Sequence, residues 1–515
     1  MTGGERSSIR PGIAAVGGYV PRLALLTETY REAWETGSAP GVDRTAVPDA
    51  DEDSLTLGVE AGRRALDAAA VDPDEVASLA FATTTPPTEE DETVVRLGSL
   101  LGTPASARTR EYGRSTRAGV AALADALTGD APTPALVVGA DCPKGSPESD
   151  TEAAAGAGAG AALIVDGGPL RAIAAGEYVD PYPGTRFRRY GRTQTERLGA
   201  GRYELDAYRT CIVGAIRDGL SDGANAISDA PDAVALTAPD GKLPYRVSGE
   251  APGLDAKRIA AGTVVSRTGD TGTAGPFLGL ADTLATGSRY PLVVGYGGGS
   301  GATAIYLSKG GSVSVNAAID PITDLTYAAY ARRRGFVTGE TPSGGGANVS
   351  VPSWRRTLPQ RHRLMAGRCI DCAALTFPPE GACVSCGSLT GYEAVRLRRT
   401  GTVEAVTAVG ASGAPPEFSV FSQRAGSFDV AVVGFDAPET SSDGDRRNDE
   451  SGASDLGTRC DTPVSIPMSV IADVDTPAVG DRVRAVPRRI YELEGVIRYG
   501  LKVVPIAALR ESHSR

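Results

Sequence analysis

The stretch RCIDCAALTFPPEGACVSCG (368–387) decides how the C-terminal part of this chain folds. It holds two C-x-x-C pairs separated by ten residues, Cys369 with Cys372 and Cys383 with Cys386. Two such knuckles can turn four thiolates toward one point, and a tetrahedral zinc ion with four sulfur ligands needs no further group. The spacing therefore predicts a closed, structural zinc site. Two alternatives stay open, a pair of disulfides and an iron ion held by the same ligands.

The length and the cysteine content of the chain limit the classes of protein to which it can belong. At 515 residues the chain exceeds what one hydrophobic core organises, so roughly two to four domains are expected. Its other cysteines, Cys142, Cys211 and Cys460, are scattered, and residues 1–12 lack the apolar stretch of a signal peptide. No run approaches the ~18 apolar residues of a membrane span. We therefore expect a cytoplasmic protein with no membrane partner.

The charge pattern disfavours nucleic acid as a partner. The formal net charge is -11 at pH 7, and acidic residues gather at 49–53, 89–92 and 435–455. Such a chain would repel a phosphate backbone. Lysine supplies only five of the 52 basic residues. An acidic, lysine-poor surface suits a high-salt, halophilic cytoplasm, and a GC-rich genome is the alternative explanation.

Short apolar runs alternate with helical stretches from Ile13 to about Gly310, which is typical of α/β layers. The expected strands are 12–20, 76–84, 135–141, 160–167, 233–239, 263–266, 290–297 and 303–308. Apolar residues at helical spacing predict helices over 55–71, 118–129 and 204–220.

A stretch biased toward Gly, Pro and Ser (338–352) marks a change of organisation. We expect a linker over 338–356, the zinc ribbon over 357–397 and a further domain over 398–515. In that last domain, short β-like runs at 401–410, 428–437, 463–472, 481–489 and 500–509 predict a small all-β barrel. The polar segment 438–457 is expected to be an insert in this barrel.

Ordered segments before residue 335 carry a resemblance to a known family. They are GIAAVGGYVPR (12–22), DSLTLGVEAGRRAL (53–66), ALVVGADCPKGSPESDTEAAAGAGAGAALI (135–164), YVDPYPGTRFRRYGR (178–192), APDGKLPYRV (238–247), GDTGTAGPFLGLADTL (269–284), VVGYGGGSGATAIYL (293–307) and ITDLTYAAYARRRG (322–335). Together they resemble archaeal hydroxymethylglutaryl-CoA synthases, which belong to the thiolase superfamily. The resemblance implies a five-layer α/β body of two similar βαβαβαββ halves, 1–165 and 166–337, usually paired into dimers.

The C-terminal part resembles a second group of proteins. Residues 361–407 and 491–505 are similar to archaeal and bacterial proteins in which a rubredoxin-like zinc ribbon precedes an OB-fold barrel. Such proteins accompany thiolases, usually as separate chains. The resemblance implies partners among thiolase or hydroxymethylglutaryl-CoA synthase subunits, in a homo- or heterodimer. A fusion of the two parts would raise their mutual effective concentration.

The resemblance also fixes where catalytic groups should lie. Family members acylate a cysteine, use a glutamate as acid and base, and polarise the second thioester with a histidine. The matching positions in this chain hold Thr116, Thr84 and Thr237 respectively. The chain has two histidines, His362 and His513, and both lie beyond the synthase-like region. A threonine hydroxyl without an adjacent base is a poor nucleophile, so the three positions argue against condensation.

Some residues could retain a binding role. Gly297, Gly298, Gly299 and Ser300 match the family's glycine-rich active-site loop, although a tight strand connection explains them equally well. Lys242 and Arg246 could meet CoA phosphates, or could simply lie on the surface. Asp270 stands where the family has an asparagine, which would place a carboxylate near the acyl oxygen. Ser115 is a residual candidate for acylation, but no Ser/His/Asp arrangement activates it.

Two functions remain in competition after this comparison. The first is a non-catalytic synthase-like protein that binds or scaffolds acyl-CoA and thiolase-family enzymes through its fused ribbon and barrel, with structural zinc and possibly CoA or acyl-CoA as ligands. The second is an active acyltransferase, either a divergent hydroxymethylglutaryl-CoA synthase or a ketoacyl-type condensing enzyme. A barrel that binds single-stranded nucleic acid is disfavoured, because the chain is acidic and only 5% of its residues are aromatic.

Overall fold

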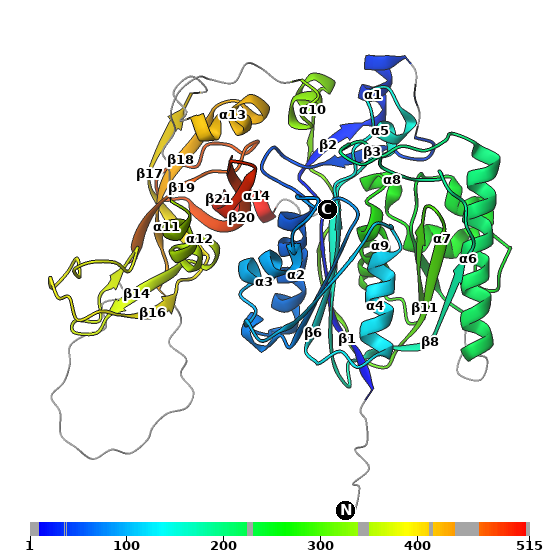
Figure 1. Cartoon of the computed structure of the whole chain (residues 1–515), viewed down its shortest axis with the longest axis horizontal. Helices are drawn as coiled ribbons and strands as arrows, with labels where there is room; N and C mark the ends of the chain where they lie inside the picture. The colour runs from blue at the N-terminus through cyan, green and yellow to red at the C-terminus, as the bar shows by residue number, and fades with distance from the viewer. Residues whose placement is uncertain are drawn as a thin grey trace, which may run out of the picture. The chain divides into compact units, whose positions relative to one another are not determined.

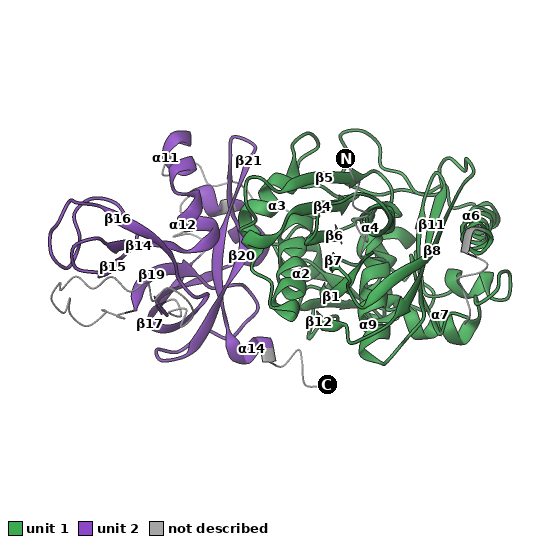
Figure 2. Cartoon of the chain, turned by 90° about the horizontal axis from the view of Figure 1, so that it is seen from below, with its two compact units in different colours: residues 1–338 green, residues 339–515 purple. Residues whose placement is uncertain are grey.

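The computed structural model divides the chain into two compact units. Unit 1 is Met1–Thr338 and unit 2 is Gly339–Arg515, drawn in different colours in Figure 2. The described residues are 10–35, 37, 39–223, 230–337, 350–410, 416–437 and 463–510. The expected insert 438–457 and most of the expected linker 338–356 lie outside them. Within the linker range, residues Val351–Arg356 form helix α11.

Unit 1 is built on a ten-stranded sheet with two sections. The strands are β1 (Pro11–Tyr19), β4 (Ser78–Thr83), β5 (Arg108–Gly113), β6 (Ala135–Asp141), β7 (Gly158–Asp166), β8 (Leu170–Val179), β9 (Ala233–Leu236), β10 (Pro291–Gly297), β11 (Gly301–Lys309) and β12 (Ser314–Ala318). The first section has the order β5-β4-β6-β7-β1-β12 and the second β8-β11-β10-β9. A single residue pair, Ile13 with Leu170, joins β1 to β8.

Helices complete a five-layer arrangement around the two sections. They are α2 (Ser54–Ala69), α3 (Thr93–Leu101), α4 (Ala118–Thr128), α6 (Gly201–Gly223), α7 (Ala256–Gly262) and α9 (Gly275–Ala285). Helices α2 and α3 pack on the first section, α6 and α7 pack on the second, and α4 and α9 contact strands of both (Figure 2). The predicted five-layer α/β body is therefore confirmed. The two expected halves lie together in unit 1, where β12 of the second half pairs with β1 of the first.

The central helical layer supplies the largest core of unit 1. Apolar side chains of α4 and α9, including Val120, Leu123 and Phe277, are buried against both sections of the sheet. Strand β7 passes so close to α9 that a Cβ on Gly160 would lie 2.2 Å from Cβ of Phe277. A glycine is therefore required there, and small residues let the central helices approach the strands closely.

Most elements expected from the sequence are confirmed. Helices α2, α4 and α6 match the three predicted helices, and seven of the eight predicted strands are present. The prediction of a strand over 263–266 is wrong, because Val265–Thr268 forms the short helix α8. Val264 and Val265 are buried there within one helical turn, and so short an apolar run cannot be told from a strand by periodicity. Among the described helices, none is long and apolar enough to cross a membrane.

Unit 2 begins with a three-stranded ribbon. Its strands are β14 (Met365–Cys369), β15 (Leu375–Thr376) and β16 (Tyr392–Arg396), in the order β15-β14-β16; Figure 1 labels β14 and β16. The stem of the ribbon shares the core of the following barrel, since Leu364, Ala366 and Leu397 pack in the barrel's hydrophobic cluster. The far end of the ribbon has a much smaller buried cluster, centred on Cys369, Ala374 and Cys383.

The rest of unit 2 is a nearly closed antiparallel barrel. It is formed by β17 (Thr400–Val409), β18 (Phe428–Phe435), β19 (Val464–Ser469), β20 (Arg482–Leu493) and β21 (Val496–Pro505), in the order β19-β18-β17-β20-β21. Just after β19, Val470 bridges Val503 of β21 in parallel, and the Ile471 N–H donates to the Val503 carbonyl at 3.0 Å. The predicted small all-β barrel is thereby confirmed.

Candidate functional site

A cavity of about 820 Å³ in unit 1 collects residues that follow β5, β9 and β10. Ligands in open α/β sheets commonly bind outside the carboxyl ends of the strands, and the volume is within the range of small-molecule sites. The lining residues are Pro40, Thr116, Thr151, Ala154, Thr185, Arg186, Thr195, Glu196, Arg197, Gly201, Glu204, Leu205, Thr237, Pro239, Asp240, Lys242, Leu243, Tyr245, Arg246, Asp270, Tyr296 and Gly298.

Two of the three threonines at the expected catalytic positions meet in this cavity. Thr116 precedes α4 and Thr237 follows β9, and each is 2% exposed. The Thr116 hydroxyl donates to the Tyr296 carbonyl at 2.6 Å, and the Tyr296 N–H donates to the Thr237 hydroxyl at 3.1 Å. Both side chains therefore bond the backbone of one residue of β10. The Thr116 proton is therefore directed at a backbone carbonyl, which is not a base that could activate this hydroxyl.

The third threonine, Thr84, does not line the cavity. Its N–H donates to Asp141 Oδ1 at 2.6 Å, and Arg188 donates to its carbonyl. Asp141 is fully buried and also accepts the Thr83 and Thr85 hydroxyls and the N–H groups of Thr85 and Thr273. The segment that should carry an acid and base is thus a loop fixed to a structural carboxylate.

An ion pair occupies the inner part of the cavity. Arg186 Nη1 donates to Asp270 Oδ2, and the Gly272 N–H donates to Asp270 Oδ1 at 3.0 Å. Burial opposes the charge of Arg186, but the attraction of Asp270 and Asp141 together outweighs it, so that the pKa of Arg186 is raised. The carboxylate that the sequence places at position 270 is therefore neutralised by an arginine, rather than presented alone to an acyl oxygen.

The glycine-rich loop at the end of β10 packs against the backbone and side chain of Arg186. A Cβ on Gly298 would lie 2.5 Å from Arg186 Cβ, so only a glycine fits there. The Gly299 N–H donates to the Thr185 hydroxyl at 3.0 Å, and the Ser300 hydroxyl lies 3.3 Å from that of Tyr296. Of the four loop positions expected to bind ligand, Gly298 lines the cavity.

The two cations that the sequence analysis expects to bind ligand, Lys242 and Arg246, both line the cavity. Lys242 caps the start of a short 3₁₀ helix, Leu243–Val247, and Arg246 lies in its last turn. The Asp240 carboxylate holds the start of this helix by accepting from the N–H groups of Lys242 and Leu243. Within the part of the chain that the structure describes, neither cation has a carboxylate partner within 4.0 Å. Their ammonium and guanidinium groups are thus available to an anionic ligand.

Ser115, the residual candidate nucleophile, is placed elsewhere. A Cβ on Gly297 would lie 1.8 Å from the Ser115 hydroxyl, which shows how tightly this side chain packs under β10. Ser115 is not among the residues that line the cavity. Its hydroxyl accepts a long bond from the Arg117 N–H, at 3.4 Å.

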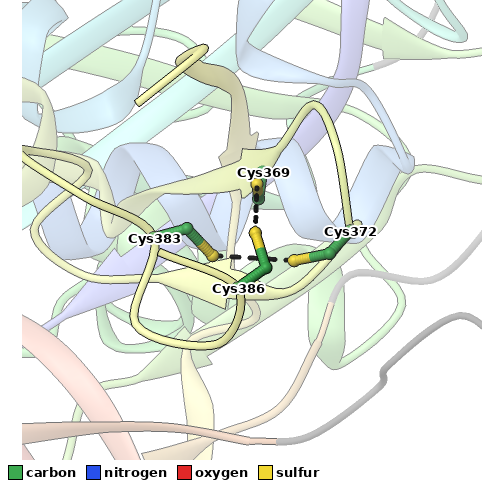
Figure 3. A group of neighbouring side chains, drawn as sticks. All are labelled: Cys369, Cys372, Cys383 and Cys386. Atoms are coloured by element: carbon green, nitrogen blue, oxygen red, sulfur yellow. Dashed lines mark hydrogen bonds between the residues drawn. The ribbon is translucent and has the colours of Figure 1, made fainter. Parts of the chain in front are cut away.

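The four ribbon cysteines form a candidate metal centre (Figure 3). All four Sγ atoms lie within 4.8 Å of one another, with 3.8 Å between Cys369 and Cys386 and 3.6 Å between Cys372 and Cys383. Four sulfurs about 2.3 Å from one tetrahedral metal lie about 3.8 Å apart, so the residues fit such an ion. The cysteines are free thiols, not disulfides. Hydrogen bonds from the backbone N–H groups of Cys386 and Ser385 lower the pKa of the Cys383 thiol, which favours the ligating thiolate.

The two knuckles share one backbone geometry. In the first, the Ala373 N–H donates to the Cys369 carbonyl at 2.9 Å, and in the second, the Gly387 N–H donates to the Cys383 carbonyl at 2.8 Å. Ala373 and Gly387 have φ of +61° and +72°. Each knuckle therefore requires a left-handed residue directly after its second cysteine.

This geometry predicts opposite effects of two substitutions. Gly387→Ala should destabilise the ribbon by about 1 kcal/mol, because an L-residue is strained at positive φ and nothing else crowds the new methyl group. Ala373→Gly should remove the same strain and stabilise the ribbon by up to about 1 kcal/mol. The temperature at which bound metal is released, followed with a chromogenic chelator, measures both. Equal release temperatures for the two variants would contradict the shared geometry.

Three residues of the site were missed by reasoning from the sequence. Arg186, Tyr296 and Asp141 were read only as parts of resembling segments. Their roles depend on contacts across 84, 180 and up to 132 positions of the chain, which no local pattern reports. The available signal was the arginine-rich run at 186–192.

Comparison with known protein families supports the predicted zinc ribbon. Residues 356–390 match the family described as ChsH2, rubredoxin-like zinc ribbon domain. The match covers the four cysteines and the strands β14 and β15. The chain thus carries a rubredoxin-like zinc ribbon, as its cysteine spacing predicts.

Comparison with curated proteins and solved structures supports the resemblance of unit 1. The chain is 29% identical over 310 residues to the hydroxymethylglutaryl-CoA synthase of Methanopyrus kandleri, covering 58% of this chain and 87% of that one. It is 29% identical over 336 residues to that of Pyrococcus furiosus, covering 63% and 92%.

Among solved structures, MvaS in complex with 3-hydroxy-3-methylglutaryl coenzyme A matches with a TM-score of 0.54 at 21% identity, covering 66% of this chain and 94% of that one. The 3-oxoacyl-(acyl carrier protein) synthase III of Pseudomonas aeruginosa matches with a TM-score of 0.52 at 21% identity, covering 59% and 99%. These structures share the thiolase-like fold. The chain is therefore similar to archaeal hydroxymethylglutaryl-CoA synthases and carries a zinc ribbon in addition.

Proposed function

We propose that this chain is an acyl-CoA-binding relative of hydroxymethylglutaryl-CoA synthases that does not transfer acyl groups. The observation that carries the proposal is a pair of hydrogen bonds at Tyr296, whose carbonyl accepts from the Thr116 hydroxyl and whose N–H donates to the Thr237 hydroxyl. These bonds use the side chains at the positions of the family's nucleophile and histidine to hold the strand end. Claisen chemistry needs a reactive nucleophile and a mobile proton there.

The remaining features of the cavity support binding rather than reaction. Lys242 and Arg246 offer cations to the phosphates of a CoA, and Arg186 offers a buried donor. Unit 1 contains no histidine in its sequence, since His362 and His513 both lie in unit 2. These residues can bind an acyl thioester, but they do not supply a nucleophile and a base that would break the thioester bond.

The ribbon and barrel support a docking role. Closing β19 onto β21 gives the cyclic order β17-β18-β19-β21-β20, from which we infer an OB-fold. Apolar side chains protrude from the ribbon, with Ile370 61%, Val384 79% and Leu389 78% exposed. Exposed apolar groups of this kind suit a protein partner. We therefore propose that unit 2 docks the chain onto a thiolase or synthase subunit in the cytoplasm, with zinc as the structural metal.

Incubation with acetyl-CoA tests the absence of acyl transfer. We expect the intact mass of the protein to stay unchanged after incubation and gel filtration, because no cysteine lines the cavity and the Thr116 hydroxyl is bonded to a carbonyl. A mass increase of one acetyl group would overturn the proposal and favour an active acyltransferase. In that case the variants Ser115→Ala and Thr116→Ala would locate the adduct.

Purification from the source cell tests the docking role separately. The full chain should co-purify with a thiolase-family subunit, and a variant with Val384→Ser and Leu389→Ser should lose that subunit while keeping its metal. If the variant retains the subunit, the docking surface does not lie on the ribbon. Purification of the wild-type chain without such a subunit would count against scaffolding.

A further inference from the structure

We propose that the four-cysteine ribbon is a redox switch, in which a peroxide oxidises the exposed Cys386 and its neighbour Cys369 to a disulfide and so releases the metal. The oxidant is a small, uncharged peroxide such as hydrogen peroxide. The switch would regulate the docking role proposed above for the ribbon, on which its biological meaning rests. It follows from the unequal exposure of the four cysteines and from the apolar residues that the knuckles carry.

The four cysteines of the ribbon differ in their access to solvent. Cys369 and Cys383 are each 3% exposed, Cys372 is half-buried and Cys386 is exposed. A cysteine that binds a metal is a thiolate, and the thiolate is the form that reacts with peroxides. Because oxidation follows thiolate character and exposure, a peroxide that arrives from solvent should react with Cys386 before it reaches the buried ligands.

A second thiolate lies close enough to Cys386 to complete a disulfide. The Sγ atoms of Cys386 and Cys369 are 3.8 Å apart (Figure 3), so they must approach by about 1.8 Å to form an S–S bond. The other close pair, Cys372 with Cys383 at 3.6 Å, has no exposed member. A sulfenic acid beside a thiol condenses with it to a disulfide. Cys369 is therefore the residue that should resolve an oxidised Cys386.

The two chemical steps balance with peroxide as the oxidant. In the first, the Cys386 thiolate attacks one peroxide oxygen, an S–O bond forms, the O–O bond breaks, and the departing hydroxide takes a proton to become water. In the second, the Cys369 thiolate attacks the sulfenic sulfur, an S–S bond forms, the S–O bond breaks, and a second hydroxide leaves and is protonated to water. The two sulfurs lose two electrons, and the peroxide gains them.

A disulfide between Cys369 and Cys386 removes half of the metal ligands. Cys372 and Cys383 remain, and two thiolates do not make the closed tetrahedral site of a structural zinc. The buried cluster at this end of the ribbon is small, so apolar burial does not replace the energy that metal binding supplies. Release of the metal therefore leaves the two knuckles without the ion that fixes one against the other.

The exposed apolar residues of the ribbon lie within or beside these knuckles. Ile370 lies between the cysteines of the first knuckle, Val384 lies between those of the second, and Leu389 follows shortly after it. Their relative placement depends on the metal that joins the knuckles. Oxidation should therefore abolish the proposed docking surface. A thiol reductant should restore it, because a disulfide is reduced by thiol exchange.

Peroxide titration of the zinc-loaded full chain tests the switch. Hydrogen peroxide should release the metal to a chromogenic chelator and leave a protein about 2 Da lighter, with a disulfide that peptide mapping places between Cys369 and Cys386. A thiol reductant with added zinc should restore the bound ion. Cys386→His, which replaces the exposed thiolate by an imidazole ligand, should release the metal about tenfold more slowly. Cys142→Ser, outside the ribbon, should release it at the wild-type rate.

Three results would overturn the switch. The first is metal that stays bound while glutathione in the same solution is oxidised, and the second is equally fast release from Cys386→His. If that variant does not bind metal, a 1,3-diketone that traps sulfenic acids in the wild-type chain decides instead. Its first adduct should be on Cys386, and a first adduct on another cysteine is the third contrary result.

None of these measurements needs a partner subunit, so they stand or fall separately from the docking proposal. The link between the two is tested on the wild-type chain with its co-purified subunit. The subunit should dissociate when peroxide releases the metal and should bind again after reduction and addition of zinc. A subunit that stays bound after the metal is lost would show that oxidation does not regulate docking.

Discussion

Replacing Cys383 with serine is expected to remove the metal and to unfold the far end of the ribbon. The buried cluster there is small, with Cys369, Ala374 and Cys383 at its centre, so apolar burial alone cannot hold the two knuckles. Binding of a structural zinc typically supplies about 10–16 kcal/mol at neutral pH, and this energy is folding energy. Metal analysis should fall from one ion per chain to nearly none. Hydrogen exchange should become fast over residues 368–391.

The stem of the ribbon should survive this change, because Leu364, Ala366 and Leu397 are buried in the barrel core. Protection of the barrel strands is therefore expected to stay close to wild type. Cys142→Ser is the matched control, since burial raises the pKa of this thiol and keeps it protonated, unlike a metal ligand. It should retain the ion. Unchanged metal content in the Cys383→Ser variant would refute the four-cysteine site, and the metal recovered from wild type distinguishes zinc from iron.

The parts of the fold that the sequence predicted are those specified by local patterns. The helix at Ser54–Ala69 has an apolar face and begins at a capping box between Asp53 and Thr56. The cysteine knuckles carry their spacing and their left-handed turn in consecutive residues. The turn at Val265–Thr268 was read wrongly, because a pair of valines is buried equally well in a strand or in a helical turn.

The chemistry of the cavity was less accessible to the same reasoning. The sequence could show that Thr116 and Thr237 replace reactive residues, but not that both bond to Tyr296. It could show a carboxylate at position 270, but not the arginine that neutralises it. Such pairs form only after strands far apart in the chain are brought together. Resemblance located the cavity, and only tertiary contacts revealed how its groups are used.

The second large effect is expected at Asp141, whose carboxylate ties the loop after β4 to the segment that carries Asp270. It accepts three N–H groups and two hydroxyls and is fully buried. Asp141→Ala would leave these donors unsatisfied, and Arg188 would lose the attraction of this carboxylate. We expect unit 1 to lose about 3–5 kcal/mol of its free energy of unfolding. Asp141→Asn, which keeps one acceptor oxygen, should lose about 1–3 kcal/mol.

Denaturant unfolding in a Trp354→Phe background measures this loss, because Trp34 of unit 1 is then the sole tryptophan. Asp125→Asn is the matched control, since its exposed carboxylate accepts a bond from Tyr112 and should change stability by less than about 1 kcal/mol. Similar losses for Asp125→Asn and Asp141→Ala would contradict the anchoring role.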